Sequence, residues 1–336
     1  MRTHKVVSCA SYGGTGSSVI SDYLLEFPII HNTGDYEFRF LQDYGGVTTL
    51  EDCLVYNYHR LNSDIAIRNF IKYIDYQSGD IFSKRYEKYF KNNFKNASYC
   101  FINKLIDAKW PGYWEQYQVL SPSVIRFLKY KLYPRIIKLL SGNKHYLARY
   151  IPKSTMYFSN PSAEYFNQCV QEYLNDLFNI IDSENQYKYL YFDQIIPPTN
   201  IERYFKYFDD LKIIVVDRDP RDLFITNYFE WHEGWIPKDI DKFIAVYGGI
   251  RIKEKSEKLN ENILKVKFED TIYKYNEFTQ SINEFLGLSK SEHVFPLRNF
   301  NPDKSIKNTR LWTKYKISHA ILSKIEKELE EFCYPF

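Results

Sequence analysis

A loop of small residues near the amino terminus has the composition of an anion-binding turn. It consists of Gly13, Gly14, Thr15, Gly16, Ser17 and Ser18. Small residues let backbone N–H groups approach an anion closely, and the unpaired donors at the start of the following helix add to the attraction. The loop therefore predicts a phosphate site, although a structural tight turn has the same composition. It is not a Walker A motif, because that motif requires a lysine that is absent here.

A second group of charged residues follows the apolar run at residues 211–216. The sequence VVDRDPRDLFITNYF places Arg218 at the end of this run and Thr226 eight residues later. An arginine at the carboxyl end of a buried strand can make charge-assisted contacts to a phosphate, and a hydroxyl one or two helical turns further on can donate to it. The alternative is a helix start at which Asp219 and Asp222 cap the helix or pair with arginines.

This second segment resembles the 3′-phosphate-binding segment of the sulfotransferase superfamily, in which a strand ends in Arg-x-Pro-Arg-Asp and a Ser or Thr stands eight residues after the first Arg. Residues 15–18 look like the Ser-Gly-Thr-Thr core of the loop with which the family binds 5′-phosphosulfate. The resemblance implies 3′-phosphoadenosine-5′-phosphosulfate (PAPS) as the donor. The loop at residues 13–18 would then bind the 5′-phosphosulfate, and Arg218 and Thr226 the 3′-phosphate.

One departure from the family concerns charge in the first loop. The family usually places Lys or Arg just before that core, where it stabilises charge on the bridging oxygen as sulfate leaves, and this sequence has Gly14. Another cation must take this role, or the reaction is different.

A late basic segment is the expected source of that cation. It resembles the segment with which sulfotransferases close over the nucleotide, although the usual Lys-Gly and Gly-x-Trp pattern is only partly present. Its expected nucleotide-binding residues are Lys304, Ser305, Lys307, Asn308, Arg310 and Trp312. Of these, Lys304, Lys307 or Arg310 could replace the missing cation. A solvated basic loop is the alternative.

The sequence GDYEFR at residues 34–39 resembles a segment of tyrosylprotein sulfotransferases in which a Glu two residues before an Arg acts as the catalytic base. Glu37 and Arg39 match that pair. Sulfuryl transfer should need an in-line approach, positioning and cationic stabilisation, and a carboxylate near the acceptor hydroxyl can take its proton. A surface Glu-Arg pair is the alternative interpretation. His145, His232 and Asp193 are competing candidates for the base, the last at the end of a predicted strand.

The pattern of strands and helices around these residues indicates an α/β fold. Buried strands are expected at residues 5–10, 29–30, 187–192, 211–216 and 263–268, and helices follow most of them. We therefore predict a three-layer, P-loop-like α/β fold with a central, mainly parallel sheet. Residues 1–336 are expected to form a single domain, in which residues 42–186 are a mainly helical insertion that binds the acceptor. The many aromatic residues of this insertion could stack on sugar rings or simply form its core.

Composition sets outer bounds on the function. Hydrophobic residues make up 44% of the 336 positions and charged residues 26%, which is typical of a globular protein. The net charge of +3 is too small to indicate a nucleic-acid partner. Five cysteines without a C-x-x-C pair indicate neither a disulfide framework nor a zinc site, and no apolar stretch reaches the roughly 18 residues of a membrane span. A cytoplasmic location is therefore expected.

A basic window in the insertion is the main local asymmetry of charge. No acidic residue lies between Glu115 and Glu164, whereas eight Lys and Arg residues do. This window predicts contact with an anionic acceptor or peripheral contact with an anionic membrane surface. The alternative is a solvated basic helix face.

The predicted reaction moves a sulfuryl group from PAPS to a hydroxyl, or alternatively an amine, and releases adenosine 3′,5′-bisphosphate. The expected acceptor is a carbohydrate of a surface polysaccharide or glycolipid. No metal is expected, because a sulfuryl group carries less charge than a phosphoryl group and no carboxylate cluster has ligand spacing. Two alternatives remain: a P-loop kinase or other phosphotransferase that needs Mg²⁺ and ATP, and a catalytically inactive protein that binds the nucleotide.

Overall fold

Five parallel strands form the central sheet of the protein, whose structure is a computed structural model describing residues 3–59, 61–142, 145–232 and 234–336. The strands lie in the order β2-β5-β1-β6-β7, and each neighbouring pair is parallel. Their bounds are β1 (Lys5–Ser11), β2 (Ile30–Glu37), β5 (Tyr189–Asp193), β6 (Asp210–Asp217) and β7 (Ile263–Lys267). The chain leaves β1 toward β2 on one side and later runs from β6 to β7 on the other. This reversal opens a crevice at the carboxyl ends of the strands, where open α/β sheets bind ligands.

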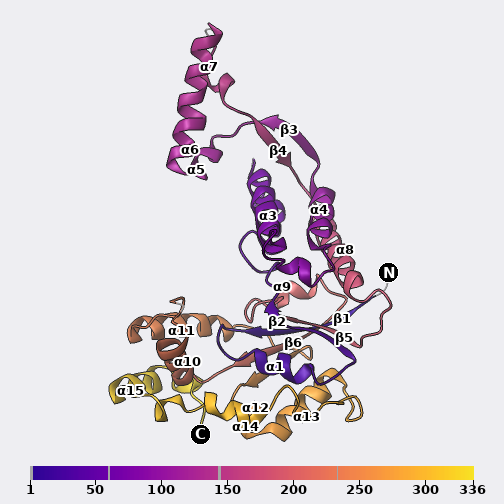
Figure 1. The fold of residues 1–336 in the computed structure, drawn as a ribbon, viewed down its shortest axis with the longest axis vertical. Coiled ribbons are helices and arrows are strands. Elements are labelled where there is room, and N and C mark those ends of the chain that lie inside the picture. Colours follow the sequence, from indigo (N-terminus) through magenta and orange to yellow (C-terminus); the bar gives the residue numbers. More distant parts are fainter. Residues whose placement is uncertain (1–2, 60, 143–144, 233) are drawn as a thin grey trace.

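Alternate side chains of the strands point to opposite faces of the sheet, and each face packs against its own layer of helices. Val6 and Phe192 point into one core with helices on that face, whereas Val7 and Tyr191 point into a second core on the other face. The first layer contains α2 (Val47–Glu51), α3 (Asn62–Ser78), α4 (Phe94–Leu105), α8 (Ala163–Ile181) and α9 (Glu202–Phe205). The second contains α1 (Ser18–Leu24), α12 (Asp270–Tyr273), α13 (Tyr275–Leu286) and α14 (Pro302–Ser305). Figure 1 shows the sheet between these two layers.

A third, smaller core lies beside the sheet. It joins α10 (Pro220–Thr226), α11 (Ile240–Glu254) and α15 (His319–Glu328) through buried residues such as Phe224, Phe243 and Ile325. α10 and α11 follow β6 along the chain, and α15 follows the C-terminal loop. All three therefore stand next to the crevice.

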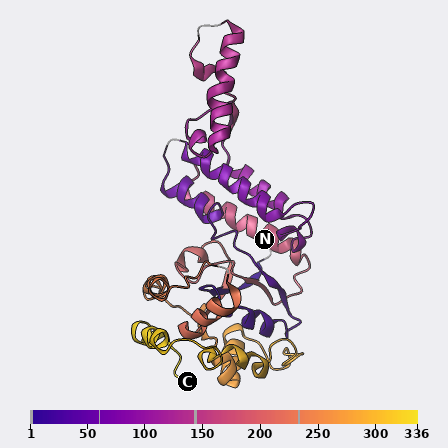
Figure 2. The same cartoon turned by 60° about the vertical axis from the view of Figure 1, so that its left-hand side comes forward.

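Residues 42–186 hold helices α2 to α8 and a two-stranded hairpin. The hairpin pairs β3 (Ala108–Gly112) with β4 (Ser154–Phe158) in antiparallel fashion. Between these strands the chain forms α5 (Gln116–Val119), α6 (Ser123–Phe127) and α7 (Tyr133–Ser141), with a π-helical turn joining α6 to α7. This arm, residues 113–153, projects away from the sheet (Figures 1 and 2).

The predicted three-layer α/β class with a parallel sheet is confirmed, and one strand differs from its predicted bounds. β2, expected at residues 29–30, runs from Ile30 to Glu37, because His31, Asn32 and Glu37 also pair with β5. α13 ends before Gly287, whose left-handed φ of +60° caps the helix.

Candidate functional site

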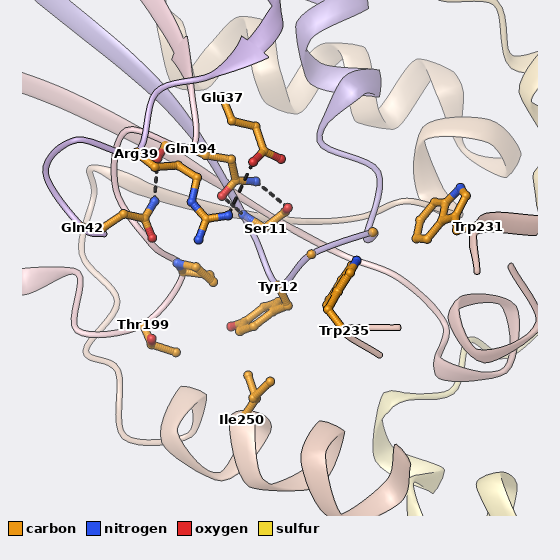
Figure 3. Close-up of a pocket in the computed structure, with 13 residues that line it drawn as sticks. Ser11, Tyr12, Glu37, Arg39, Gln42, Gln194, Thr199, Trp231, Trp235 and Ile250 are labelled. Atoms are coloured by element: carbon orange, nitrogen blue, oxygen red, sulfur yellow. Dashed lines mark hydrogen bonds and ion pairs between the residues drawn. The ribbon is translucent and has the colours of Figure 1, made fainter. Parts of the chain in front are cut away.

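The carboxyl ends of the parallel strands bring part of the predicted site residues to one edge. Two adjoining cavities open there, a larger one of ≈590 Å³ and a smaller one of ≈330 Å³. Both are lined by Ser11, Gly14, Glu37 and Trp231, so the two cavities meet at the first loop. Figure 3 shows residues that line the larger cavity.

The small-residue loop is held as a bare stretch of backbone. Gly13, Gly14 and Gly16 have φ values of +84°, +69° and +94°, which L residues with a side chain rarely adopt. The hydroxyl of Thr15 donates to the carbonyl of Val216 at 2.7 Å and ties the loop to β6. The loop therefore exposes backbone groups to the cavities, as a cradle for an anion requires.

Arg218 and Thr226 meet in the smaller cavity, as their spacing predicts. Nη2 of Arg218 donates to Oγ1 of Thr226 at 3.2 Å and to the carbonyl of Asn308 at 2.7 Å, and Nη1 donates to the carbonyl of Gly14 at 3.3 Å. The guanidinium also lies over the Phe268 ring, 5.0 Å from its centroid. Among the described residues, the buried Nε of Arg218 has no hydrogen-bond partner. The hydroxyl of Thr226 donates to a backbone carbonyl of its own helix, that of Asp222.

The late basic segment is fastened beside this cavity through its backbone. The buried carboxylate of Asp222 accepts hydrogen bonds from the backbone N–H groups of Arg310 (2.9 Å) and Leu311 (2.7 Å). Asn308 lines the smaller cavity, and Trp312 packs against Arg221 away from it. The remaining predicted residues, Lys304, Ser305, Lys307 and Arg310, line neither cavity. Among the residues that the structure describes, the cations that do line them are Arg39 and Arg218.

Glu37 and Arg39 lie together at the rim of the cavities. Nη1 of Arg39 is 3.6 Å from Oε2 of Glu37, and its Nε donates to Asp43 at 2.9 Å. Glu37 lines both cavities and is exposed, whereas Arg39 lines the larger one. In Figure 3 both side chains stand beside Gln194 and above Ser11.

The three competing bases are placed very differently. Asp193 is buried behind the first loop, where its Oδ2 accepts a hydrogen bond from Ser17 at 3.1 Å. His232 follows Trp231, but its ring pairs with Lys238 at 2.8 Å and lines neither cavity. His145 is exposed in the arm, and the structure does not bring it to the site.

Burial raises the pKa values of three carboxyl groups around the site. Desolvation, followed by the charge of Glu37, raises the pKa of Asp193 to about 7. Desolvation likewise raises the pKa of Glu269 to about 8 and that of Asp222 to about 6. The same burial lowers the pKa of Arg218 from its ordinary value, against the opposing effect of the nearby carboxylates.

Comparisons with known proteins give no match to a family model or to a curated protein. Solved structures to which the chain is similar are sulfotransferases. The sulfotransferase domain of the Synechococcus PCC 7002 olefin synthase is 11% identical, with a TM-score of 0.38, over 100% of this chain and 91% of that one. A sulfotransferase of Mycobacterium tuberculosis H37Rv is 9% identical, with a TM-score of 0.37, over 92% and 77%. The sulfotransferase domain from the curacin biosynthetic pathway is 12% identical, with a TM-score of 0.39, over 100% and 94%.

Two tryptophans that the sequence interpretation passed over stand on the first loop. A Cβ atom at Gly13 would lie 2.6 Å from the Trp235 ring, and one at Gly14 would lie 2.4 Å from the Trp231 ring. The sequence NYFEWHEGW after Arg218 carried a signal, because exposed aromatics close to a phosphate-binding segment are candidates for ligand contact.

Further residues of the larger cavity also went unnoticed in the sequence. They are Ser11, Tyr12, Gln42, Gln194, Pro198, Thr199 and Ile250. The ring of Tyr12 lies over the guanidinium of the fully buried Arg251, whose carbon Cζ is 3.5 Å from the ring centroid. Arg251 is held in turn by Asp217 and Glu254. No local sequence pattern predicts this stack, because its members come from different elements.

No three or more His, Cys, Asp and Glu side chains within residues 3–59, 61–142, 145–232 and 234–336 are grouped so that they could hold a metal ion. Over the same residues, no helix combines the length and the apolar composition needed to cross a membrane.

Proposed function

We propose that this protein is a sulfotransferase that uses PAPS as its donor. The observation that carries the proposal is the convergence of Arg218, Thr226 and Asn308 on a cavity whose other wall is the bare glycine loop. The site fits a doubly anionic ligand, since the buried Nε of Arg218 has no partner among the described residues and the glycines of the loop place no side chain between its backbone and the cavity. The 3′-phosphate would bind at Arg218 and the 5′-phosphosulfate at the loop.

Glu37 is the group best placed to take the acceptor's proton. It lines both cavities and therefore stands between a donor in the smaller cavity and an acceptor in the larger one. In the proposed step the acceptor oxygen forms a bond to sulfur as the bond from sulfur to the bridging phosphate oxygen breaks. The hydroxyl proton passes to the Glu37 carboxylate, and adenosine 3′,5′-bisphosphate leaves.

Arg39 is our candidate for the cation that the glycine loop lacks. Lys304, Lys307 and Arg310 line neither cavity, whereas Arg39 lines the larger one, with its guanidinium close to Glu37. A lysine at position 14 would need a φ of +69° and would meet the Trp231 ring. This chain therefore has to supply its positive charge from the opposite side of the loop.

The lining of the larger cavity favours a carbohydrate acceptor. Tyr12, Trp231 and Trp235 offer aromatic faces on which a sugar ring can stack, and Gln42, Gln194 and Thr199 offer donors and acceptors for hydroxyl groups. Figure 3 shows the polar group around Glu37 on one side of the cavity and Ile250 on another. All five cysteines are unpaired, which supports a reducing, cytoplasmic location for the reaction.

Calorimetric titration with adenosine 3′,5′-bisphosphate tests the donor site. We expect the wild type to bind this nucleotide and Arg218→Ala to lose about 2 kcal/mol or more of binding free energy, because a charged hydrogen-bond partner is removed. Arg298→Ala is the matched control, since Arg298 is exposed and lines neither cavity. Binding of ATP with Mg²⁺ but not of the bisphosphate would replace the proposal with a kinase. Tight binding of the bisphosphate without turnover on any hydroxyl acceptor would indicate an inactive nucleotide-binding protein.

A further inference from the structure

The arm carries a helix that packs against the rest of the protein on only one side. α6, the π-helical turn and α7 form one continuous helical segment, residues 123–141. Its Tyr130 and Pro134 are buried against the arm's other segments, which include Leu147–Tyr150. The opposite side faces solvent along the length of the arm (Figure 2).

That outer side is an apolar stripe. Its members recur at steps of three and four residues, which places them on one face of a helix. They are Ile125, Leu128, Leu132, Ile136, Leu139 and Leu140. All six are exposed, and Leu139 and Leu140 are 83% and 77% exposed. Four of them, together with Tyr133 and Pro152, line a shallow apolar depression of ≈470 Å³. A monomer in water gains nothing from leaving such a stripe uncovered.

Basic residues border the stripe on both sides. Helical spacing places Lys131, Arg135 and Lys138 along one border and Arg126 and Lys129 along the other. From residue 116 to residue 163 the sequence contains eight Lys and Arg residues and no Asp or Glu. Lys129 lies in the wall of the apolar depression itself, so charge and apolar surface are continuous.

From this arrangement we infer that the arm is a docking surface for an anionic lipid bilayer. The stripe would enter the boundary between headgroups and acyl chains, and the bordering Lys and Arg side chains would extend to the lipid phosphates. A second copy of the chain fits poorly as the occupant, because it would bring the same excess of positive charge against this one. The inference does not depend on the proposed sulfotransferase activity, since the arm shares no residue with either cavity.

Co-sedimentation of the full-length protein with vesicles tests this inference. We expect binding to vesicles in which about one lipid in three is phosphatidylglycerol, and much weaker binding to pure phosphatidylcholine. Leu139→Glu with Leu140→Glu should reduce binding to the anionic vesicles more than about tenfold, because each basic or apolar contact at such a surface contributes roughly fivefold. The matched control is Ile81→Glu with Phe82→Glu, an adjacent, exposed, apolar pair outside the arm.

A charge variant tests the contribution of the basic residues separately from that of the apolar stripe. Lys131→Glu with Arg135→Glu should weaken binding to anionic vesicles, whereas Lys258→Glu with Lys290→Glu, exposed lysines elsewhere, should not. An unchanged circular-dichroism spectrum and an unchanged urea-unfolding midpoint of every variant report that the body remains folded. Equal binding of the wild type to both kinds of vesicle, or to neither, would overturn the inference, as would arm variants that sediment like the wild type. A dimer in sedimentation velocity that the Leu139 and Leu140 changes dissociate, without vesicle binding, would show that a second copy covers the stripe.

Discussion

At the scale of single residues, two neighbouring carboxyl groups stand in different environments. Glu37 is exposed at the rim of both cavities, whereas Asp193 is buried behind the first loop with a pKa raised to about 7. Only Glu37 reaches the space where an acceptor hydroxyl could lie. The environments therefore favour Glu37 as the base and Asp193 as a group that holds Ser17 in place.

Removal of the Glu37 carboxylate should slow turnover and leave donor binding intact. We expect Glu37→Gln to lower kcat by about 10²- to 10⁴-fold, the usual contribution of a positioned general base. The assay is production of adenosine 3′,5′-bisphosphate from PAPS in the presence of an oligosaccharide acceptor. Glu277→Gln, an exposed control outside both cavities, should keep the wild-type rate. A Glu37→Gln enzyme with the wild-type kcat would show that Glu37 is not the base.

Asp193 should make the stability of the protein depend on pH. Its carboxyl group keeps its proton in the folded protein up to a pKa of about 7, against 3.8 for an ordinary Asp. Between these values the folded state binds more protons than the unfolded state, so the free energy of unfolding falls as pH rises and levels off above the folded pKa. The slope from this one group is at most about 1.4 kcal/mol per pH unit.

Urea unfolding of Asp193→Asn across this range isolates the effect. The variant cannot ionise at this position but can still accept the hydrogen bond from Ser17. Its free energy of unfolding relative to wild type should therefore rise between about pH 4 and about pH 7. For Asp209→Asn, a change at an exposed position, the free energy of unfolding should follow the pH dependence of the wild type. A constant difference between Asp193→Asn and the wild type would mean that the buried carboxyl group does not hold its proton.

At the scale of elements, the glycine loop and the tryptophans form one unit. Gly14→Ala must place a Cβ atom at a φ of +69° and within 2.4 Å of the Trp231 ring. We expect it to lower the free energy of unfolding by about 2–4 kcal/mol, the sum of a left-handed backbone and an overpacked contact. Thermal or urea unfolding measures this loss.

Gly142→Ala separates the two contributions to this loss. Gly142 has a similar φ of +63° but nothing within 4 Å of the added atom, so its substitution should cost only the backbone part, about 1–2 kcal/mol. In a Trp231→Ala background the excess cost of Gly14→Ala should shrink but not vanish, because Cδ1 of Leu223 also lies 2.9 Å from the added atom. If Gly14→Ala and Gly142→Ala cost the same, the ring does not rest on the loop.

The sequence predicted elements whose signals are local and missed those that depend on distant segments. Arg218 stands at the end of a strand and Thr226 on the helix that follows it, so their spacing alone brings the two side chains into contact. The β3–β4 hairpin was missed because the five residues of β3, which include Pro111 and Gly112, do not alternate between apolar and polar. The expected cation from Lys304, Lys307 or Arg310 does not line the cavities, because Asp222 holds the backbone of that loop. No pattern near residue 304 could show this.

At the scale of the whole molecule, the sheet and the helical layer cannot separate without loss of a shared core. The ring of Phe192 on β5 packs against those of Phe38, which follows β2, of Phe90, in a turn before α4, and of Phe178 on α8. The arm is different, because among the described residues its core cluster contains three buried apolar side chains, Tyr117 and Tyr130 of the arm and Met156 of β4. Local stability follows buried apolar contacts, so the arm should open more easily than the layer below it.

Hydrogen exchange of the native protein measures this difference directly. Without lipid, backbone amides of α7 should exchange at least about a hundredfold faster than those of α8, since α8 buries eight side chains in the protein and α7 buries one. Substitution of Phe192 by Ala, which removes a ring from the shared core, should speed exchange in α8 and in β5 together and leave α7 unchanged. Equal protection of α7 and α8 would show that the arm is part of the same cooperative unit as the sheet and the helical layer.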